Sequence, residues 1–189
     1  TVSPWSAVAS DGVTARIRSV DGPSGHRALC LDYDFHGRSG YAVARRNLSM
    51  HYPENYTFDL QWRGSGPANN IEFKLANASG DTVWWARKPA LELPEAWTPL
   101  RIRKRQIQFA WGPHNDPVLK ESAAFELTVR AAKGGAGMAC IADLGFRELP
   151  PVSCASTAVK NRSMPAPSTP KPILWSPKCW MICTSKPPI

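Results

Sequence analysis

The stretch NNIEFKLANASGDTVWWARK, residues 69–88, decides the fold of this chain. Between residues 71 and 75, apolar side chains alternate with charged ones, which is the period-two pattern of a half-buried strand. Turn-forming residues follow at 77–81, and an apolar segment with two adjacent tryptophans comes after them. The stretch therefore predicts a β-hairpin with one face in a core and the other outside.

The outer face of this hairpin is the first candidate site. Continuing the alternation assigns Val83 and Trp85 to the apolar side and Trp84 to the opposite side, with Glu72 and Lys74. A flat ring can cover the apolar C–H face of a pyranose, while charged groups bond its hydroxyls. This combination favours a sugar-binding surface. The alternative is a solvated sheet face with one tryptophan packed under a loop.

Similar alternation recurs along the chain, and turn signals separate the runs at intervals of roughly 8–12 residues. Further strands are predicted at 13–20, 28–35, 41–48, 56–63, 100–111, 125–131 and 138–149. About nine such strands predict an all-β, two-sheet antiparallel β-sandwich. Its expected core consists of Phe58, Leu60, Trp62, Ile71, Phe73, Leu75, Trp85, Ile107, Phe109, Leu127 and Phe146.

The net charge of +8 is unevenly distributed over the 189 residues. Residues 1–151 hold 18 Lys and Arg against 15 Asp and Glu, whereas residues 152–189 hold 5 basic residues and no acidic ones. The near balance of the first part argues against nucleic acid as a partner.

No apolar run approaches the roughly 20 residues that insertion into a membrane requires. The first ten residues lack the features of a signal peptide.

Composition also divides the chain into a domain, residues 1–151, and a Pro/Ser-rich basic tail, residues 152–189. The tail contains seven prolines and apolar residues without periodicity, so we expect it to be disordered. Its abrupt lack of acidic residues also resembles the product of a reading-frame change.

Of the five cysteines, Cys30 and Cys140 lie in strand-like runs. The odd count leaves at least one thiol unpaired in a monomer, and no zinc-site spacing is present.

A basic cluster is the one feature of the domain that suggests phosphate binding. It consists of Arg101, Arg103, Lys104 and Arg105. The interpretation favoured by the sequence is a solvated edge strand, because charged edge strands deter aggregation.

Several segments carry a family resemblance: LDYDFHGRSGYAVARRNL (31–48), PENYTFDLQWRG (53–64), NNIEFKLANASGDTVWW (69–85), LRIRKRQIQFAWGP (100–113) and CIADLGFREL (140–149). Together they resemble the N-terminal modules of large bacterial secreted glycoside-hydrolase-like proteins. Those modules are jelly-roll β-sandwiches of the galactose-binding-like type, related to discoidin domains and carbohydrate-binding modules. The resemblance covers residues 5–150 and implies an extracellular or periplasmic location.

The resemblance also implies a structural calcium ion between an early loop and the last strand. Such modules commonly end that strand in two consecutive acids, whereas this chain has Ala142 and Asp143. Asp143 with Asp11 or Asp21 would supply oxygen ligands for calcium.

Catalysis by this chain is not expected. Sugar hydrolysis requires two carboxylates held about 5–10 Å apart, and no motif places a second acid beside Glu72. Hydrolase, zinc-protease and Walker motifs are absent from the sequence. We therefore expect a monomeric, non-catalytic carbohydrate-binding module that targets an attached or partner glycoside hydrolase to polysaccharide. The alternatives are a discoidin-like protein–protein or cell-surface adhesion module, and a structural spacer.

The expected site follows from taking strands 56–63, 70–76 and 82–88 as neighbours in one sheet, as short connections favour. Its predicted ligand-binding residues are Trp84, Glu72, Lys74, Arg63, Gln61, Gln108 and Arg45. A module that binds a polysaccharide or oligosaccharide should expose Trp84, whereas a spacer should cover it.

Overall fold

The structure, a computed structural model, describes residues 4–113 and 118–151, so the predicted tail lies outside the described residues. The described part consists of strands and one 3-10 turn, and no helix in it is long and apolar enough to cross a membrane. The elements are β1 (Trp5–Ala9), β2 (Thr14–Asp21), β3 (Arg27–Asp34), β4 (Tyr41–His51), β5 (Tyr56–Ser65), β6 (Asn69–Ala76), β7 (Val83–Leu91), β8 (Thr98–Arg103), η1 (Lys104–Gln106), β9 (Gln108–Trp111), β10 (Glu121–Arg130) and β11 (Ala136–Glu148).

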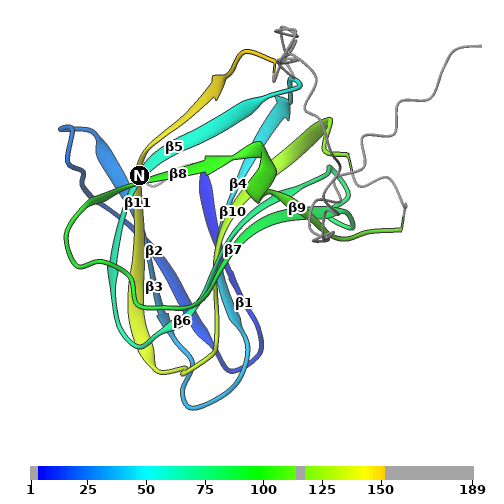
Figure 1. The fold of residues 1–189 in the computed structure, drawn as a ribbon. Coiled ribbons are helices and arrows are strands. Elements are labelled where there is room, and N and C mark those ends of the chain that lie inside the picture. Colours follow the sequence, from blue (N-terminus) through cyan, green and yellow to red (C-terminus); the bar gives the residue numbers. More distant parts are fainter. Residues whose placement is uncertain (1–3, 114–117, 152–189) are drawn as a thin grey trace, which may run out of the picture. The chain divides into compact units, whose positions relative to one another are not determined.

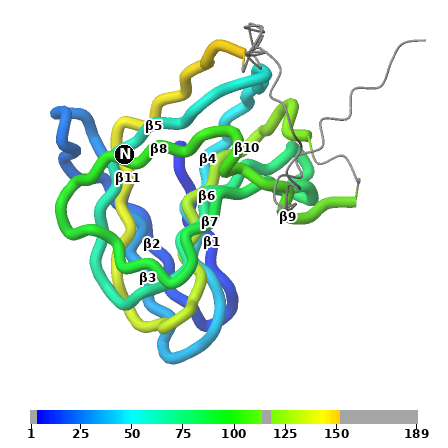
Figure 2. Tube along the Cα trace, in the orientation of Figure 1, coloured from blue at the N-terminus to red at the C-terminus, as the bar shows by residue number. Residues whose placement is uncertain are grey.

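Two antiparallel sheets form a sandwich, which confirms the predicted fold class (Figure 1). The six-stranded sheet has the order β1-β4-β10-β6-β7-β9, and the five-stranded sheet has the order β2-β3-β11-β5-β8. The tube in Figure 2 follows the chain as it passes from one sheet to the other and back. The last two strands, β10 and β11, each lie in the interior of a sheet.

Two predictions about the sheets are wrong: strands 56–63, 70–76 and 82–88 do not share one sheet, and residues 100–111 do not form one strand. In both cases the chain passes from one sheet to the other. β5 pairs with β8 and β11 in the five-stranded sheet, whereas β6 and β7 pair in the six-stranded one. Between β5 and β6 the chain turns at Gly66, whose φ of 112° favours glycine. The predicted strand 100–111 is likewise divided: β8 belongs to one sheet, β9 to the other, and η1 connects them.

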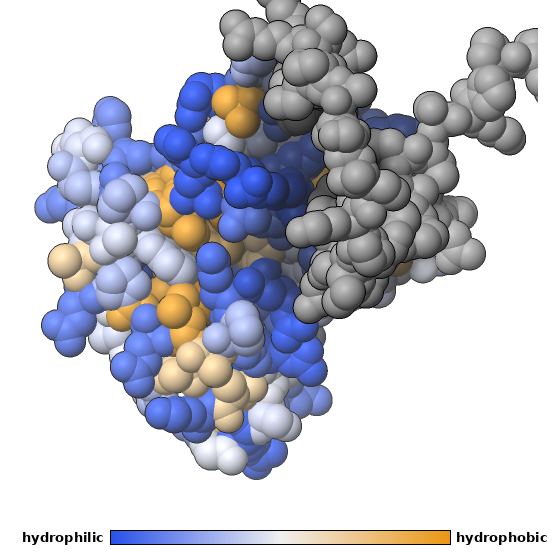
Figure 3. All heavy atoms as spheres, in the orientation of Figure 1, coloured by the Kyte–Doolittle hydropathy of each residue, from blue (hydrophilic) through white to orange (hydrophobic). Residues whose placement is uncertain are grey.

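The core lies between the sheets and contains most of the residues predicted for it. The buried ones are Phe58, Leu60, Trp62, Ile71, Phe73, Leu75 and Leu127. Ile107 and Phe109 are only partly buried, and Trp85 is not a core residue. Phe146 is 37% exposed, although its ring packs against those of Tyr56 and Phe58. Hydrophobic residues appear only as small patches on the surface seen in Figure 3.

A disulfide between Cys30 and Cys140 links β3 to β11, where the two residues pair directly in the register. Both side chains are almost fully buried. The sequence left their pairing open because 110 residues separate them. The bond joins the second and third strands of the five-stranded sheet.

Candidate functional site

The outer face of the six-stranded sheet carries polar and aromatic side chains in rows that the strand register defines. One row crosses all six strands: Ser6, Arg45, Glu126, Lys74, Trp85 and Gln108. The neighbouring row crosses five strands: Val8, Val43, Thr128, Glu72 and Arg87. A cleft of about 770 Å³ lies over this face, and Tyr41, Trp111 and Arg130 also line it. We call this surface the six-stranded face.

Glu72 is the most deeply placed charge of the six-stranded face, because its side chain is 1% exposed. The Lys74 Nζ lies 3.1 Å from its Oε2, and the Arg87 Nε lies 3.5 Å from its Oε1. Within the described residues, Glu72 Oε1 accepts no hydrogen bond, and neither does the buried hydroxyl of the adjacent Thr128 have a partner. Buried polar atoms normally have partners, and the nearest cation to Glu72 Oε1 is the Arg87 guanidinium at 3.5 Å.

A second ion pair fixes the side chains on the other half of the row. Arg45 donates from Nη1 to Glu126 Oε1 at 2.6 Å, and both side chains are partly buried. Glu126 stands directly between Arg45 and Lys74 in the register. Charged groups held in this way need little further ordering when a ligand binds, which lowers the entropic cost of binding.

Aromatic rings stand on both sides of the polar centre. The rings of Trp85 and Trp111 meet edge to face, with centroids 5.5 Å apart and planes at 87°. The Arg87 guanidinium lies 4.5 Å above the Trp85 ring, and the Lys74 Nζ lies 5.5 Å from the Trp111 centroid. Trp111 is 44% exposed, and Tyr41, on the other side of the cleft, is 43% exposed. Rings so exposed offer apolar faces to a ligand.

The prediction that Trp84 lies on the exposed face is wrong, and Trp85 takes that place. Trp84 pairs with Leu75, is 7% exposed, and contacts the Phe109 ring edge to face. Trp85 pairs instead with Lys74 and is partly exposed. The four consecutive apolar residues at 83–86 gave the alternation no polar position from which to fix its phase.

Two other predicted site residues, Gln61 and Arg63, lie on the wrong sheet for the site. Both belong to β5 in the five-stranded sheet, where the Arg63 guanidinium lies 4.8 Å from the Trp97 ring centroid. Their separation from Glu72 follows from the change of sheet after β5.

The other predicted residues do come together. Arg45, Glu72, Lys74 and Gln108 share the six-stranded face, and Gln108 lies directly opposite Trp85. Their role in ligand binding stays a prediction.

Sequence reasoning missed several members of the six-stranded face. Glu126 was detectable, because it occupies an outward position in the alternating run FELTVRA. The pairing of β7 with β9 shifts register between Val83, which pairs with Trp111, and Trp84, which pairs with Phe109. That irregularity, which the sequence does not signal, brings Trp111 to the outer face. Tyr41 and Arg130 pair with each other at the end of β4 and β10.

The residues expected to hold calcium make other polar contacts, and calcium binding stays a prediction. Asp143 accepts a hydrogen bond from the Ser24 hydroxyl at 2.6 Å and lies 3.4 Å from the His26 ring. Asp21 pairs with Arg27. Over the described residues, no three Asp, Glu, His or Cys side chains assemble in a way that could hold a metal.

Comparisons with known proteins agree with this architecture. The chain matches no protein-family model and no curated protein sequence. It is similar to the family 11 carbohydrate-binding module of the cellulosomal cellulase Lic26A-Cel5E of Clostridium thermocellum, with a TM-score of 0.63 and 12% identity over 79% of this chain and 90% of that one. A family 11 module from Clostridium thermocellum, in complex with a β-1,3-1,4-mixed-linked tetrasaccharide, gives a TM-score of 0.61 with 13% identity over 76% and 88% of the two chains.

A catalytic protein also contains a similar region. An exo-β-agarase matches with a TM-score of 0.53 and 12% identity, over 80% of this chain but only 24% of the agarase. The similarity at these identities concerns the fold. The described residues therefore have the jelly-roll β-sandwich fold of carbohydrate-binding modules.

Proposed function

We propose that this chain is a non-catalytic carbohydrate-binding module and that the six-stranded face binds a stretch of polysaccharide. The observation that carries the proposal is the combination, in one cleft of about 770 Å³, of exposed rings with side chains fixed by ion pairs. A structural neighbour with the same fold holds a mixed-linked tetrasaccharide. A spacer domain would have no need of such an exposed aromatic cleft.

The chemistry of the face suits a neutral sugar chain. Tryptophan and tyrosine rings cover the apolar faces of pyranose units, while carboxylates and cations bond the hydroxyls around their edges. Glu72 and Glu126 balance two of the three cations that lie against them, so a single positive charge remains at the centre of the cleft. Each hydroxyl exchanges bonds with water for bonds with protein at small net gain, so most of the selectivity comes from ring contact.

The same ion pairs argue against hydrolysis by this face. A glycoside hydrolase needs one carboxyl group as a general acid and another as a base or nucleophile. Glu72 and Glu126 are instead held by Lys74, Arg87 and Arg45. We propose that the module brings an attached or partner glycoside hydrolase to its substrate. The buried disulfide suits an extracellular or periplasmic location, since such bonds persist in oxidising compartments.

Affinity electrophoresis tests the proposal directly. The chain is run through native gels that contain mixed-linkage β-glucan, agarose or another neutral polysaccharide, and its mobility is compared with that in plain gels. We expect retardation in at least one of them and loss of retardation in Trp111→Ala. Trp97→Ala is the matched control, because Trp97 lies beside Arg63 and the five-stranded sheet. Absence of retardation in the whole panel, or equal loss in the control, would contradict the proposal.

A further inference from the structure

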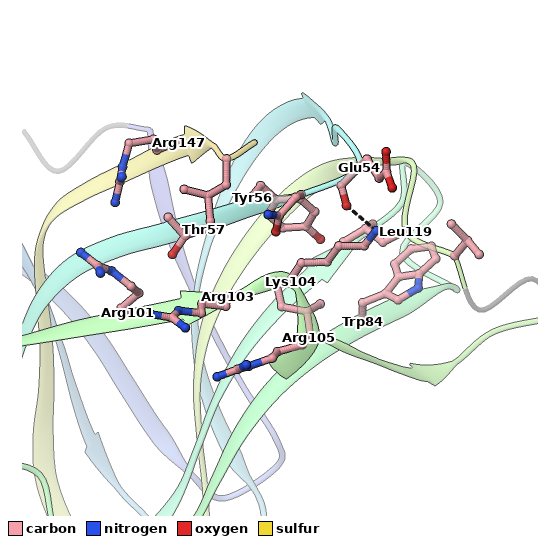
Figure 4. A pocket seen from close by; sticks show the side chains of 14 residues that line it. Glu54, Tyr56, Thr57, Trp84, Arg101, Arg103, Lys104, Arg105, Leu119 and Arg147 are labelled. Atoms are coloured by element: carbon pink, nitrogen blue, oxygen red, sulfur yellow. Dashed lines mark hydrogen bonds between the residues drawn. The ribbon is translucent and has the colours of Figure 1, made fainter. Parts of the chain in front are cut away.

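A second recess lies at a different place in the molecule, along the outer side of the five-stranded sheet and η1. It has a volume of about 710 Å³ and is lined by parts of β5, β8, η1 and the end of β11 (Figure 4). Apolar side chains complete the lining, namely Trp84 of β7 with Ile107, Val118 and Leu119. Its lining contains one carboxylate, that of Glu54, and the five basic residues Arg101, Arg103, Lys104, Arg105 and Arg147. We call this surface the basic recess.

The strand register explains why cations gather here. Arg103 pairs with Thr57, which in turn pairs with Arg147, so the two arginines flank one buried threonine. With strands about 4.8 Å apart, the backbones of the two arginines lie about 10 Å from each other. Arg101 is the next residue of β8 that faces the same side as Arg103, and it pairs with Asp59. The arrangement brings basic residues distant in sequence to one side of the sheet.

Asp59 orients two of the guanidinium groups. It accepts a hydrogen bond from Arg101 Nε at 2.6 Å and another from Arg147 Nη2 at 2.9 Å. These two donors hold the pKa of the Asp59 carboxyl below its usual value. The single carboxylate therefore positions two arginines but balances only one of their charges.

Among the described residues, none neutralises Arg103, Lys104 or Arg105 of the basic recess. Within residues 4–113 and 118–151, no carboxylate lies within ion-pair distance of Arg103 or Arg105, and both are exposed. Lys104 Nζ donates to the backbone carbonyl of Glu54 at 2.6 Å, a bond that fixes the ammonium without cancelling its charge. In Figure 4 the guanidinium groups of the four arginines lie on one side of the recess, away from Trp84 and Leu119.

We propose that the basic recess is a second ligand site, which binds the anionic substituents of a polysaccharide, namely sulfate esters or carboxylates. Guanidinium groups bind such oxyanions through pairs of parallel hydrogen bonds. Arg103 and Arg105 supply the uncompensated charges, and the arginines held by Asp59 supply donors in fixed positions. The choice of polysaccharide as the carrier of the anion rests on the proposed function, whereas the anion site itself does not.

The distribution of charge favours a polysaccharide over nucleic acid. Proteins that bind nucleic acid present many cations along the path of the phosphate backbone. Here residues 1–151 hold 18 basic and 15 acidic residues, and the excess is concentrated in one recess with Asp59 beside it. A recess of this kind fits one or two anionic groups of a polysaccharide chain.

The experiment compares two double variants of the full chain that remove the same charge. Arg103→Gln/Arg105→Gln alters the basic recess, and Arg16→Gln/Lys133→Gln alters exposed positions on other parts of the surface. Affinity is measured at low salt with dextran sulfate, polygalacturonate, uncharged dextran, inorganic sulfate and duplex DNA. Thermal melting verifies that both variants are folded.

We expect dextran sulfate, polygalacturonate or both to bind the unaltered chain, and uncharged dextran not to bind. The recess variant should lose about tenfold in affinity or more, the equivalent of one charge-assisted hydrogen bond, while the control variant loses little. The proposal is overturned by equal loss in the control, by DNA bound as tightly as the anionic polysaccharide, or by inorganic sulfate bound as tightly per sulfate as dextran sulfate.

The proposed sugar site on the six-stranded face and the proposed anion site in the basic recess can be tested independently of each other. The recess variant should keep its retardation in gels of neutral polysaccharide, and Trp111→Ala should keep its affinity for dextran sulfate. Loss of both kinds of binding in the recess variant would show that the basic recess is not a site of its own.

Discussion

The exchange of roles between Trp84 and Trp85 gives the sharpest test of the structure. Trp84 is 7% exposed and packs against Phe109, so Trp84→Ala leaves a large cavity near the core. Such truncations cost about 3–5 kcal/mol. At about 2–4 °C per kcal/mol for a domain of this size, the melting temperature should fall by about 6–20 °C. Retention by neutral polysaccharide should persist at temperatures where the variant is folded.

Trp85→Ala should have the opposite effect. Its ring contacts are the edge of Trp111 and the guanidinium of Arg87, both on a partly solvated surface. Contacts of these kinds contribute about 1 kcal/mol each, so the loss of stability should be about 2 kcal/mol or less. Retention by polysaccharide should disappear, because the ring is central to the proposed binding row.

Thermal melting followed by circular dichroism, together with affinity electrophoresis, measures both effects on the same samples. The reasoning is refuted if Trp85→Ala destabilises the domain as much as Trp84→Ala does. It is also refuted if Trp84→Ala melts within about 2 °C of the unaltered protein, a shift worth less than about 1 kcal/mol. Either result would mean that Trp84 does not point into the core or that Trp85 does not lie on the outer face, contrary to the strand register.

Two further expectations concern stability. Cys30→Ala/Cys140→Ala should lower the free energy of unfolding by about 2–5 kcal/mol, because the bond closes a long loop in the unfolded chain; an unchanged urea midpoint would contradict this. Asp59→Asn should cost less than about 1 kcal/mol at pH 7, since the carboxylate is 36% exposed and its pairs with Arg101 and Arg147 are screened. The pKa of Asp59 is lower in the folded state, so its contribution is present above the unfolded pKa and is lost as pH falls through the folded one. Urea midpoints of the variant and the unaltered protein should therefore converge in acid, and a difference that grew instead would be evidence against the pairing.

The sequence predicted the strands best where apolar and polar residues alternate strictly. In β5, the inward positions of Phe58, Leu60 and Trp62 follow from such alternation, and all three are buried. The outward placement of Glu72 and Lys74 on β6 follows in the same way. A strand with one buried face specifies its own orientation, because a shift of one residue would expose its entire apolar side.

Other features depend on pairings that no local pattern records. The run at 83–86 is apolar throughout, so only its register against β6 distinguishes Trp84 from Trp85. The run LRIRKRQIQFAW reads as one strand, but η1 divides it between two sheets. The alternation of β5 identifies its buried face but not its sheet, which is why Gln61 and Arg63 were placed beside Glu72. The partners of a strand are set by contacts distant in sequence, and a single sequence does not display them.

The interior positions of β10 and β11 have a consequence for biosynthesis. Each is flanked by strands made much earlier, β4 and β6 for β10, and β3 and β5 for β11. The six-stranded sheet lacks β10 until the ribosome has completed residue 130, and the five-stranded sheet lacks β11 until residue 148, so the earlier strands present unpaired edges. Cys30 has no partner thiol until residue 140 has been made. Neither sheet can therefore be completed before its interior strand has been made, and long-range pairing of this kind folds slowly. A nascent chain of this topology remains open to aggregation and proteolysis until its last strand is inserted.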